Sequence, residues 1–369
     1  MIRSQADSSA TWLTLELKTV HEDDRPVYVS GTFNDWASGD ERYRMTKVAP
    51  GQYTLRIDLP PSDELIAYKY LRGTWEGVEV DEHGNESPNR IVRPGQQLRR
   101  DRVPRWKQDG LFYDPAFLPK IVILSEEFEV PQLIRTRRIA ALLPHDYEER
   151  TDRRYPVLYL QDGQNLFDEY APFGNWAVDK RLAFLAEQGM GDLIVISIDH
   201  AEDKRIAEFT PSHQTRLGRG EGKKYVRFLA DTLKPYVDRY FRTLPGWAHT
   251  GIGGSSMGGL ISIYAGLMYP EVYGRLMIFS PSLWVMPQIP FQLLNFSEPY
   301  GGRIYLYGGQ KESDTMVPNL ERLKHAIEEQ LRDAPVKPVF KLSVDPEGEH
   351  NEARWGEEFP RAVRWLFYH

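Results

Sequence analysis

The chain contains no cysteine and no apolar run long enough to cross a bilayer. The first absence excludes disulfide bonds, thiol catalysis and cysteine-ligated zinc, and we expect no metal and no cofactor. The second argues against a membrane partner. Residues 1–7 also lack the apolar core of a signal peptide. The lack of a visible signal peptide favours a cytoplasmic location, whereas the lack of cysteine leaves the redox compartment open.

A strong positive charge is missing as well. The 46 lysines and arginines are outnumbered by 53 acidic residues, which gives a net charge of −7. With no long basic run, this balance argues against a nucleic-acid partner. The 369 residues suffice for two domains, and 41% hydrophobic with 27% charged residues is typical of a soluble globular protein. Composition leaves the oligomeric state open.

The first hundred residues have the pattern of short strands separated by turns. Residues 12–17 alternate between apolar and polar side chains, and further strand-like runs follow at 27–30, 51–59 and 66–71. Strands at this spacing without helical segments predict a small all-β, immunoglobulin-like sandwich over residues 1–100. Polar and proline-bearing sequence over residues 101–118 is predicted to be a linker.

From residue 119 to 369 the chain alternates between apolar strands and amphipathic helices. This alternation predicts an α/β domain with a doubly wound, mostly parallel sheet covered by helices on both faces. In such sheets reactive residues lie at the carboxyl ends of the strands. The predicted strands are 121–124, 136–143, 157–160, 193–198, 276–279, 303–307 and 339–342, and the predicted helices are 176–187, 223–240, 257–268, 318–332 and 358–367.

Residues 254–258 fit the G-x-S-x-G pattern of a nucleophile elbow, with Ser256 at its centre. A sharp turn between a strand and a helix presents the serine hydroxyl to a base, and small flanking residues let the backbones pass closely. Residues 247–253 are extended in character, and apolar residues at helical spacing run from Leu260 until Pro270. We therefore interpret Ser256 as a nucleophile rather than part of a glycine-rich loop.

A serine nucleophile needs a histidine base and an acid that orients the base. In the α/β-hydrolase order both follow the serine. Of the three histidines after Ser256, His325 lies mid-helix among charges and His369 ends the chain, whereas His350 lies in a loop after the last predicted strand. His350 is therefore the predicted base.

The acid is expected in the loop after the strand at 303–307. Glu312 and Asp314 are both candidates there, and we favour Glu312 with Asp314 as the alternative. The residue that is not the acid would be a helix N-cap or a surface charge. Asp345 is a third choice.

An oxyanion hole requires two backbone N–H groups aimed at the developing charge. One is expected from Met257, which directly follows the nucleophile. The other is expected from the loop after the strand at 157–160, where Gly163 permits close approach. We predict the amides of Gly163 and Gln164 for this role.

The order of these motifs resembles the esterase-D-type branch of the α/β-hydrolases, which includes enterochelin esterases, feruloyl and acetylxylan esterases of carbohydrate esterase family 1, and mycolyltransferases. The resemblance extends from about residue 126 to the end and implies a serine esterase. It rests on residues 158–167, 176–179, 205 with 208–211, 254–259, 280–284, 309–312, and 348–351 with 355.

The resemblance also places four further residues beside the expected site. Arg205 and Glu208 would lie on the loop that follows the strand ending near residue 199, where they would either hold polar substrate groups or fix the loop. Trp176 and Trp284 are candidates for the walls of the acyl or alcohol pocket, although large aromatic residues are nearly as often part of a core.

The N-terminal region is similar to glycogen- and starch-binding sandwich modules of families 20 and 48. The similarity covers residues 27–36, 68–70, 73–76 and 89–90. It maps glucan contacts onto Trp36, Lys69, Trp75 and Asn89. Indole rings stack on sugar faces while lysine and asparagine bond to hydroxyl groups, so an α-glucan is a candidate partner. The same scaffold is a structural lid in many enzymes.

The sequence therefore predicts a serine carboxylic-ester hydrolase acting on small-molecule or carbohydrate-linked acyl or aryl esters, of the feruloyl or acetyl esterase type. An enterochelin-type siderophore trilactone esterase is the first alternative, and Arg205 is the basic residue that such an anionic substrate would need. A glucan-binding protein without catalysis is a second alternative. Acyl transfer to a sugar alcohol instead of water also stays open.

Overall fold

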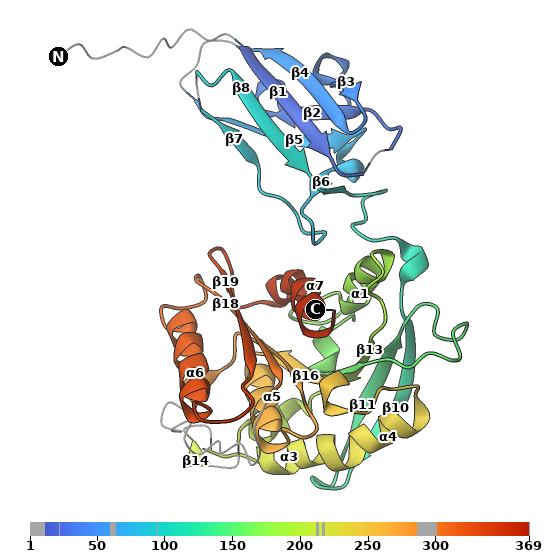
Figure 1. Cartoon of the computed structure of the whole chain (residues 1–369), viewed down its shortest axis with the longest axis vertical. Helices are drawn as coiled ribbons and strands as arrows, with labels where there is room; N and C mark the ends of the chain where they lie inside the picture. The colour runs from blue at the N-terminus through green and yellow to red at the C-terminus, as the bar shows by residue number, and fades with distance from the viewer. Residues whose placement is uncertain are drawn as a thin grey trace, which may run out of the picture. The chain divides into compact units, whose positions relative to one another are not determined.

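The structure is a computed structural model, and it describes residues 12–21, 23–59, 64–93, 95–211, 214–215, 218–285 and 301–368. The chain divides into two compact units, Met1–Asp114 and Pro115–His369 (Figure 1). Residues 1–7, on which the expected location rests, lie outside the described part. Within the described ranges, no helix has both the length and the apolar character needed to cross a membrane.

The first unit is the expected β-sandwich. One sheet has the order β3-β4-β1-β8 and a second has the order β2-β5-β7. On β1 the inward residues Leu13, Leu15 and Leu17 are at most 1% exposed, because alternate side chains of a strand point to opposite faces. The strands are β1 (Trp12–Thr19), β2 (Val27–Gly31), β3 (Thr46–Ala49), β4 (Gln52–Asp58), β5 (Ile66–Arg72), β6 (Glu79–Val80), β7 (Arg90–Val92), β8 (Leu98–Val103) and β9 (Arg105–Trp106).

The predicted linker begins later than expected. Strand β8 pairs in parallel with β1, with Lys18 opposite Arg102, and β9 pairs with β6. Residues 101–106 are therefore part of the sandwich, and the boundary between the units falls after Asp114. The charged residues of β8 look like linker sequence because only one face of this strand is buried.

The second unit contains an eight-stranded sheet of order β10-β11-β13-β12-β16-β17-β18-β19. From β13 to β19 neighbouring strands are parallel, whereas β10 and β11 are antiparallel to their neighbours. This confirms the predicted α/β-hydrolase fold. The strands are β10 (Lys120–Val130), β11 (Arg135–Leu143), β12 (Val157–Gln161), β13 (Ile194–Ile198), β16 (Thr250–Ser255), β17 (Arg275–Phe279), β18 (Arg303–Gly309) and β19 (Val339–Asp345), with a separate pair β14 (Gln214–Thr215) and β15 (Gly218–Arg219).

Helices cover both faces of this sheet (Figure 1). Residues of α3, α5 and α6 share one apolar cluster with alternate strand residues such as Ile252, Ile278 and Leu306. Helices α1 and α7 pack against each other, and α7 also packs on β17 and β18. The helices are α1 (Val178–Glu187), α2 (Arg205–Phe209), α3 (Gly222–Phe228), α4 (Lys234–Tyr240), α5 (Met257–Met268), α6 (Met316–Gln330) and α7 (Glu352–Phe367).

Two predicted helices differ from the structure by more than the shifts of two residues seen at the ends of α1 and α6. Helix α7 begins at Glu352 rather than at residue 358, because the side chain of Asn351 accepts a hydrogen bond from the backbone N–H of Arg354 and caps the helix. The single helix predicted over 223–240 is interrupted by a π-helical turn, Leu229–Leu233, directly before α4. Pro235 lies in the first turn of α4, and proline removes a backbone donor and crowds the preceding turn. The earlier start of α7 places its first turn directly beside His350.

Candidate active site

Ser256 lies at a strained turn between β16 and α5. Its backbone has φ 55° and ψ −121°, a region that residues other than glycine rarely adopt. Two hydrogen bonds hold this conformation: its N–H donates to Phe279 O at 3.0 Å, and its carbonyl accepts from Ser282 N at 3.0 Å. The turn is therefore fixed to the carboxyl end of β17, and it has the geometry of a nucleophile elbow.

The glycines of the elbow are required by close packing. A Cβ atom at Gly254 would lie 2.9 Å from the carbonyl carbon of Gly258, and a Cβ atom at Gly258 would lie 2.8 Å from Oδ2 of Asp162. Both distances are shorter than real Cβ contacts allow. The pattern in the sequence thus reflects the crossing of β16, α5 and the loop after β12.

His350 and Glu312 are in direct contact. Nδ1 of His350 lies 2.6 Å from Oε2 of Glu312. The Glu312 side chain is 1% exposed, whereas that of His350 is 40% exposed. Asp314, the alternative acid, is exposed. The structure thus brings the histidine together with Glu312.

Two backbone segments bring these residues together. The N–H of Gln310 donates to Asp345 O at 2.9 Å, and the N–H of Lys311 donates to Gly348 O at 3.0 Å. The loop after β18 therefore continues to pair with the loop after β19. A Cβ atom at Gly309 would lie 2.2 Å from Gly348 O, so a larger residue would separate the two loops.

A short turn after β17 connects the nucleophile to the acid. Ser280 Oγ donates a hydrogen bond to Oε1 of Glu312 at 2.6 Å. The same Glu312 Oε1 also accepts a hydrogen bond from the N–H of Gly309 at 2.6 Å. Two residues later, Ser282 Oγ lies 3.1 Å from Ser256 Oγ. Ser256 and Glu312 therefore both contact the turn at residues 280–282, and His350 is connected to this turn through Glu312. The motif at 280–284 in the sequence does not by itself indicate the roles of its two serines.

Trp355 supports this arrangement from α7. Its Nε1 donates to Ser280 Oγ at 2.9 Å, and its ring meets the His350 ring edge-on with centroids 4.9 Å apart. Trp355 is 3% exposed. A single buried indole thus contacts both the histidine and the serine that bonds to Glu312.

The expected oxyanion residues lie at the carboxyl ends of β12 and β16. Met257 is the first residue of α5, and the first N–H groups of a helix have no partner within it. Gly163 begins a short 3-10 turn, and the Gln164 side chain is held by the backbone of His200 through two 3.0 Å hydrogen bonds. This positions the amides of Gly163 and Gln164 on a fixed loop.

Arg205 does not pair with Glu208. Its Nε and Nη2 atoms donate to Oδ1 and Oδ2 of Asp162 at 2.6 and 2.9 Å. Glu208 is fully buried and forms ion pairs with Arg135 and Arg137 instead, so it stabilises the packing of α2. The carboxylate of Asp162, which lies beside the elbow, thus balances the positive charge of Arg205.

Two other carboxyl groups, those of Asp199 and Glu352, have raised pKa values. Burial raises the pKa of Asp199, which follows β13, to about 6. Burial also raises the pKa of Glu352, whose Oε1 accepts from Asn165 Nδ2 at 3.3 Å. Both groups hold a proton at a higher pH than exposed carboxyl groups do.

The two tryptophans expected at the pocket differ in environment. Trp176 is 3% exposed and stacks on Phe279 with ring centroids 5.3 Å apart. It therefore belongs to the core between α1, α7 and the sheet. Trp284 is 59% exposed and lies two residues after Ser282, which leaves it available to contact substrate.

In the sandwich unit, Trp36 and Trp75 lie together. Their ring centroids are 6.2 Å apart, and Trp75 Nε1 donates to Trp36 O at 3.3 Å. Lys69 Nζ donates to the carbonyl of Ser87, two residues before the exposed Asn89. Two of the four glucan candidates thus form a tryptophan pair. The other two are connected, because Lys69 is hydrogen-bonded to the loop that carries Asn89.

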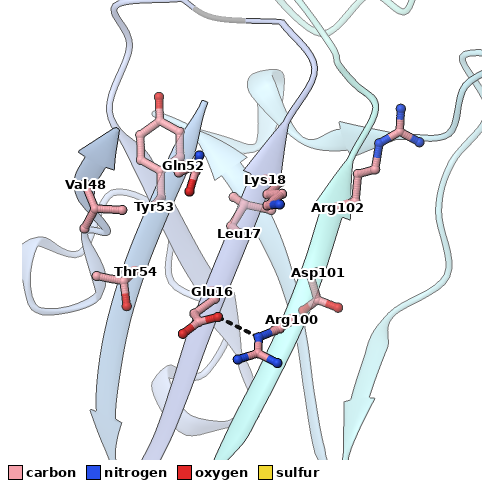
Figure 2. A pocket seen from close by; sticks show the side chains of 10 residues that line it. All are labelled: Glu16, Leu17, Lys18, Val48, Gln52, Tyr53, Thr54, Arg100, Asp101 and Arg102. Atoms are coloured by element: carbon pink, nitrogen blue, oxygen red, sulfur yellow. Dashed lines mark hydrogen bonds and ion pairs between the residues drawn. The ribbon is translucent and has the colours of Figure 1, made fainter. Parts of the chain in front are cut away.

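A pocket lies elsewhere on this unit, on the sheet β3-β4-β1-β8 (Figure 2). Its volume is about 650 Å³, and its lining includes Lys18, Gln52 and Arg102. Glu16 and Arg100, which face each other on the adjacent strands β1 and β8, form an ion pair at 2.8 Å in its lining. Its lining includes none of the four glucan candidates, so the tryptophan pair is a separate surface.

Relatives match this chain over different shares of its length. An alpha-amylase of Niallia circulans is 37% identical over 84 residues, which are 22% of this chain and only 6% of the amylase. The enterobactin esterase of Shigella flexneri, solved in the presence of enterobactin, is 17% identical with a TM-score of 0.52, covering 97% of this chain and 93% of that one. A ferulic acid esterase structure is 18% identical with a TM-score of 0.50, covering 68% of this chain and 99% of that one. At these identities, the two structures show a shared fold.

Residues 131–366 match the family described as "Putative esterase". This range contains the elbow, the acid loop and the histidine loop, and it spans more than half of the chain. The chain belongs to this esterase family and is a serine carboxylic-ester hydrolase of the α/β-hydrolase fold.

Proposed function

We propose that the enzyme hydrolyses neutral, hydroxyl-rich acyl or aryl esters through an acyl-enzyme on Ser256. The observation that carries this proposal is the bidentate contact of Asp162 with Arg205 at 2.6 and 2.9 Å. Because Asp162 balances the charge of Arg205, this cation is not free to bind an anionic catecholate or carboxylate. A sugar-linked ester carries no such charge, and its hydroxyl groups can bond to neutral and charged side chains alike.

In the proposed reaction, Ser256 Oγ attacks the ester carbonyl and its proton passes to Nε2 of His350. Glu312 accepts a hydrogen bond from Nδ1 of His350, which fixes the tautomer and stabilises the imidazolium. The amides of Met257 and Gly163 or Gln164 stabilise the oxyanion. The leaving alcohol takes the proton from His350, and a water molecule then releases the acid by the same steps.

A Ser256→Ala variant tests the nucleophile. The wild type should hydrolyse p-nitrophenyl acetate and react with a fluorophosphonate probe, and the variant should do neither. If the variant kept full esterase activity, the proposed nucleophile would be wrong. If the wild type did not react with the probe but bound amylose, the chain would act as a glucan-binding protein.

A panel of substrates tests the proposed class. We expect kcat/KM for feruloyl and acetyl sugars to exceed kcat/KM for enterobactin-type trilactones, both iron-free and ferric. The reverse order would favour the siderophore trilactone esterase, which is the second candidate because an enterobactin esterase structure covers 97% of this chain. Products separated in the presence of excess sugar alcohol distinguish hydrolysis from acyl transfer.

An α-glucan is the proposed partner of the sandwich unit. The tilted pair of Trp36 and Trp75, with Trp75 38% exposed, supports this assignment, as does the short match to an alpha-amylase. Glucan binding would concentrate the esterase on polysaccharide-bound esters without changing the chemistry at Ser256.

A further inference from the structure

A second serine hydroxyl contacts the candidate nucleophile. Ser282 Oγ lies 3.1 Å from Ser256 Oγ, and Ser282 is 3% exposed. Its backbone is held on both sides, because its N–H donates to Ser256 O at 3.0 Å and its carbonyl accepts from Val285 N at 3.1 Å. The Ser282 hydroxyl is therefore fixed beside the atom that reacts.

The proton count at Ser256 decides the direction of this hydrogen bond. A serine hydroxyl has one proton to donate and can accept through its lone pairs. For attack on an ester, the Ser256 proton must point to His350. In the reactive arrangement Ser282 is consequently the donor and Ser256 Oγ the acceptor.

A donor at this position affects the two half-reactions unequally. In the free enzyme, Ser256 Oγ is a hydroxyl oxygen and already accepts the hydrogen bond from Ser282 well. This bond therefore stabilises the ground state and the transition state of acylation to a similar extent, and the rate of acylation changes little. In the acyl-enzyme, Oγ is an ester oxygen and a poor acceptor, whereas in the transition state of its expulsion it carries developing negative charge. Only an interaction that strengthens in the transition state accelerates a step.

We infer that Ser282 is a catalytic residue of deacylation, which stabilises Ser256 Oγ as the leaving group when the acyl-enzyme is hydrolysed. This inference rests on the proposed function. Water attacks the acyl carbonyl and gives its proton to His350 Nε2. The bond between the carbonyl carbon and Oγ then breaks, and the proton on His350 returns to Oγ. Ser282 keeps its own proton throughout.

The test separates the two half-reactions with p-nitrophenyl acetate. Stopped-flow release of p-nitrophenolate measures acylation, and intact mass spectrometry of acid-quenched samples measures the decay of the acetyl-enzyme. Loss of one hydrogen bond to a developing charge predicts that Ser282→Ala slows this decay about tenfold. Acylation should change by less than about threefold, so that acetyl-enzyme accumulates. Ser282→Thr keeps the donor and should restore the decay.

Ser262→Ala is the matched control, since Ser262 is buried as well and its hydroxyl donates to Gly258 O on α5 at 2.7 Å rather than to Ser256. It should leave both rate constants near the wild-type values. If Ser282→Ala fails to fold, Ser282→Cys keeps the side-chain volume with a weaker donor and should show the same slowed decay. Equal slowing of both steps, or no change in the decay, would overturn the inference. An acetyl adduct on a Ser256→Ala variant would instead refute the proposed function.

Discussion

Oε2 of Glu312 lies 2.6 Å from Nδ1 of His350, although 38 residues separate them in the chain. The other oxygen of this carboxylate accepts from Ser280 and from Gly309, so both oxygens have fixed partners. The carboxylate is thereby held in one orientation toward the imidazole. This relationship distinguishes Glu312 from Asp314, which is exposed.

Glu312→Gln should lower kcat for p-nitrophenyl acetate about 10⁴-fold, because an amide no longer holds the tautomer that accepts the Ser256 proton. Asp314→Asn is the matched control and should keep near wild-type activity. Steady-state kinetics, with melting temperatures to check folding, measure both. Comparable losses in the two variants would contradict the assignment of the acid.

Gly163→Ala should damage the oxyanion loop. The added Cβ would lie 2.3 Å from Asp199 Oδ1 and 2.9 Å from Asp199 N, so the loop has to move. A displacement of about 1 Å at a catalytic group costs about 100-fold in rate. Gly246→Ala is the control, since among the described residues no atom other than those of its chain neighbours lies within 4 Å of its added Cβ. Wild-type kcat in Gly163→Ala would place the oxyanion hole elsewhere.

Asp162→Asn should shift the preference between charged and neutral esters. Asn tolerates the left-handed backbone of this position, φ 58°, but leaves the Arg205 charge unbalanced. The ratio of kcat/KM for p-nitrophenyl hemisuccinate to that for p-nitrophenyl butyrate should rise about tenfold, which corresponds to roughly 1.4 kcal/mol of charge interaction.

Asp203→Asn removes the same charge from the exposed pair with Lys204 and should leave this ratio unchanged. An unchanged ratio in Asp162→Asn as well would mean that Arg205 does not influence the charge of the bound substrate.

Asp199→Asn should change the pH dependence of stability. Burial raises the pKa of Asp199 from 3.8 to about 6, so the folded protein retains a proton that the unfolded chain releases between about pH 4 and pH 6. Stability therefore falls as the pH rises through this window and stays lower above it. The variant should be about 1–3 kcal/mol more stable than wild type at pH 8 and show no such gain at pH 4. Denaturant unfolding at both pH values measures this, and a gain of equal size at pH 4 would exclude the protonation effect.

Trp75→Ala should weaken binding to amylose about tenfold, because the indole supplies the stacking surface of the tryptophan pair. Affinity electrophoresis of the full chain measures it. Trp284→Ala removes an exposed tryptophan of the other unit and serves as the control. Wild-type mobility that amylose does not alter would remove the glucan from the proposed partners.

Local patterns in the sequence determined the fold class and the order of its elements. Alternation with period two marks the strands of the sandwich, and apolar strands between amphipathic helices mark the parallel sheet. The elbow at Ser256 and the loop position of His350 follow from short motifs, since their glycines and neighbouring elements lie within a few residues. These patterns do not predict the capping by Asn351 or the π-helical turn before α4, because both depend on single side chains at the ends of helices.

The tertiary structure decided which distant side chains meet. The choice of Glu312 over Asp314 depends on the pairing of the loops after β18 and β19, where Gly309 and Gly348 pass closely. The partner of Arg205 is Asp162 rather than Glu208, which is nearer in sequence, because α2 turns Glu208 inward to Arg135 and Arg137. The contact of Ser282 with Ser256 exists only because β16 and β17 are neighbours. The order of the strands in the sheet brings these residues together, and this order cannot be derived from their spacing in the sequence.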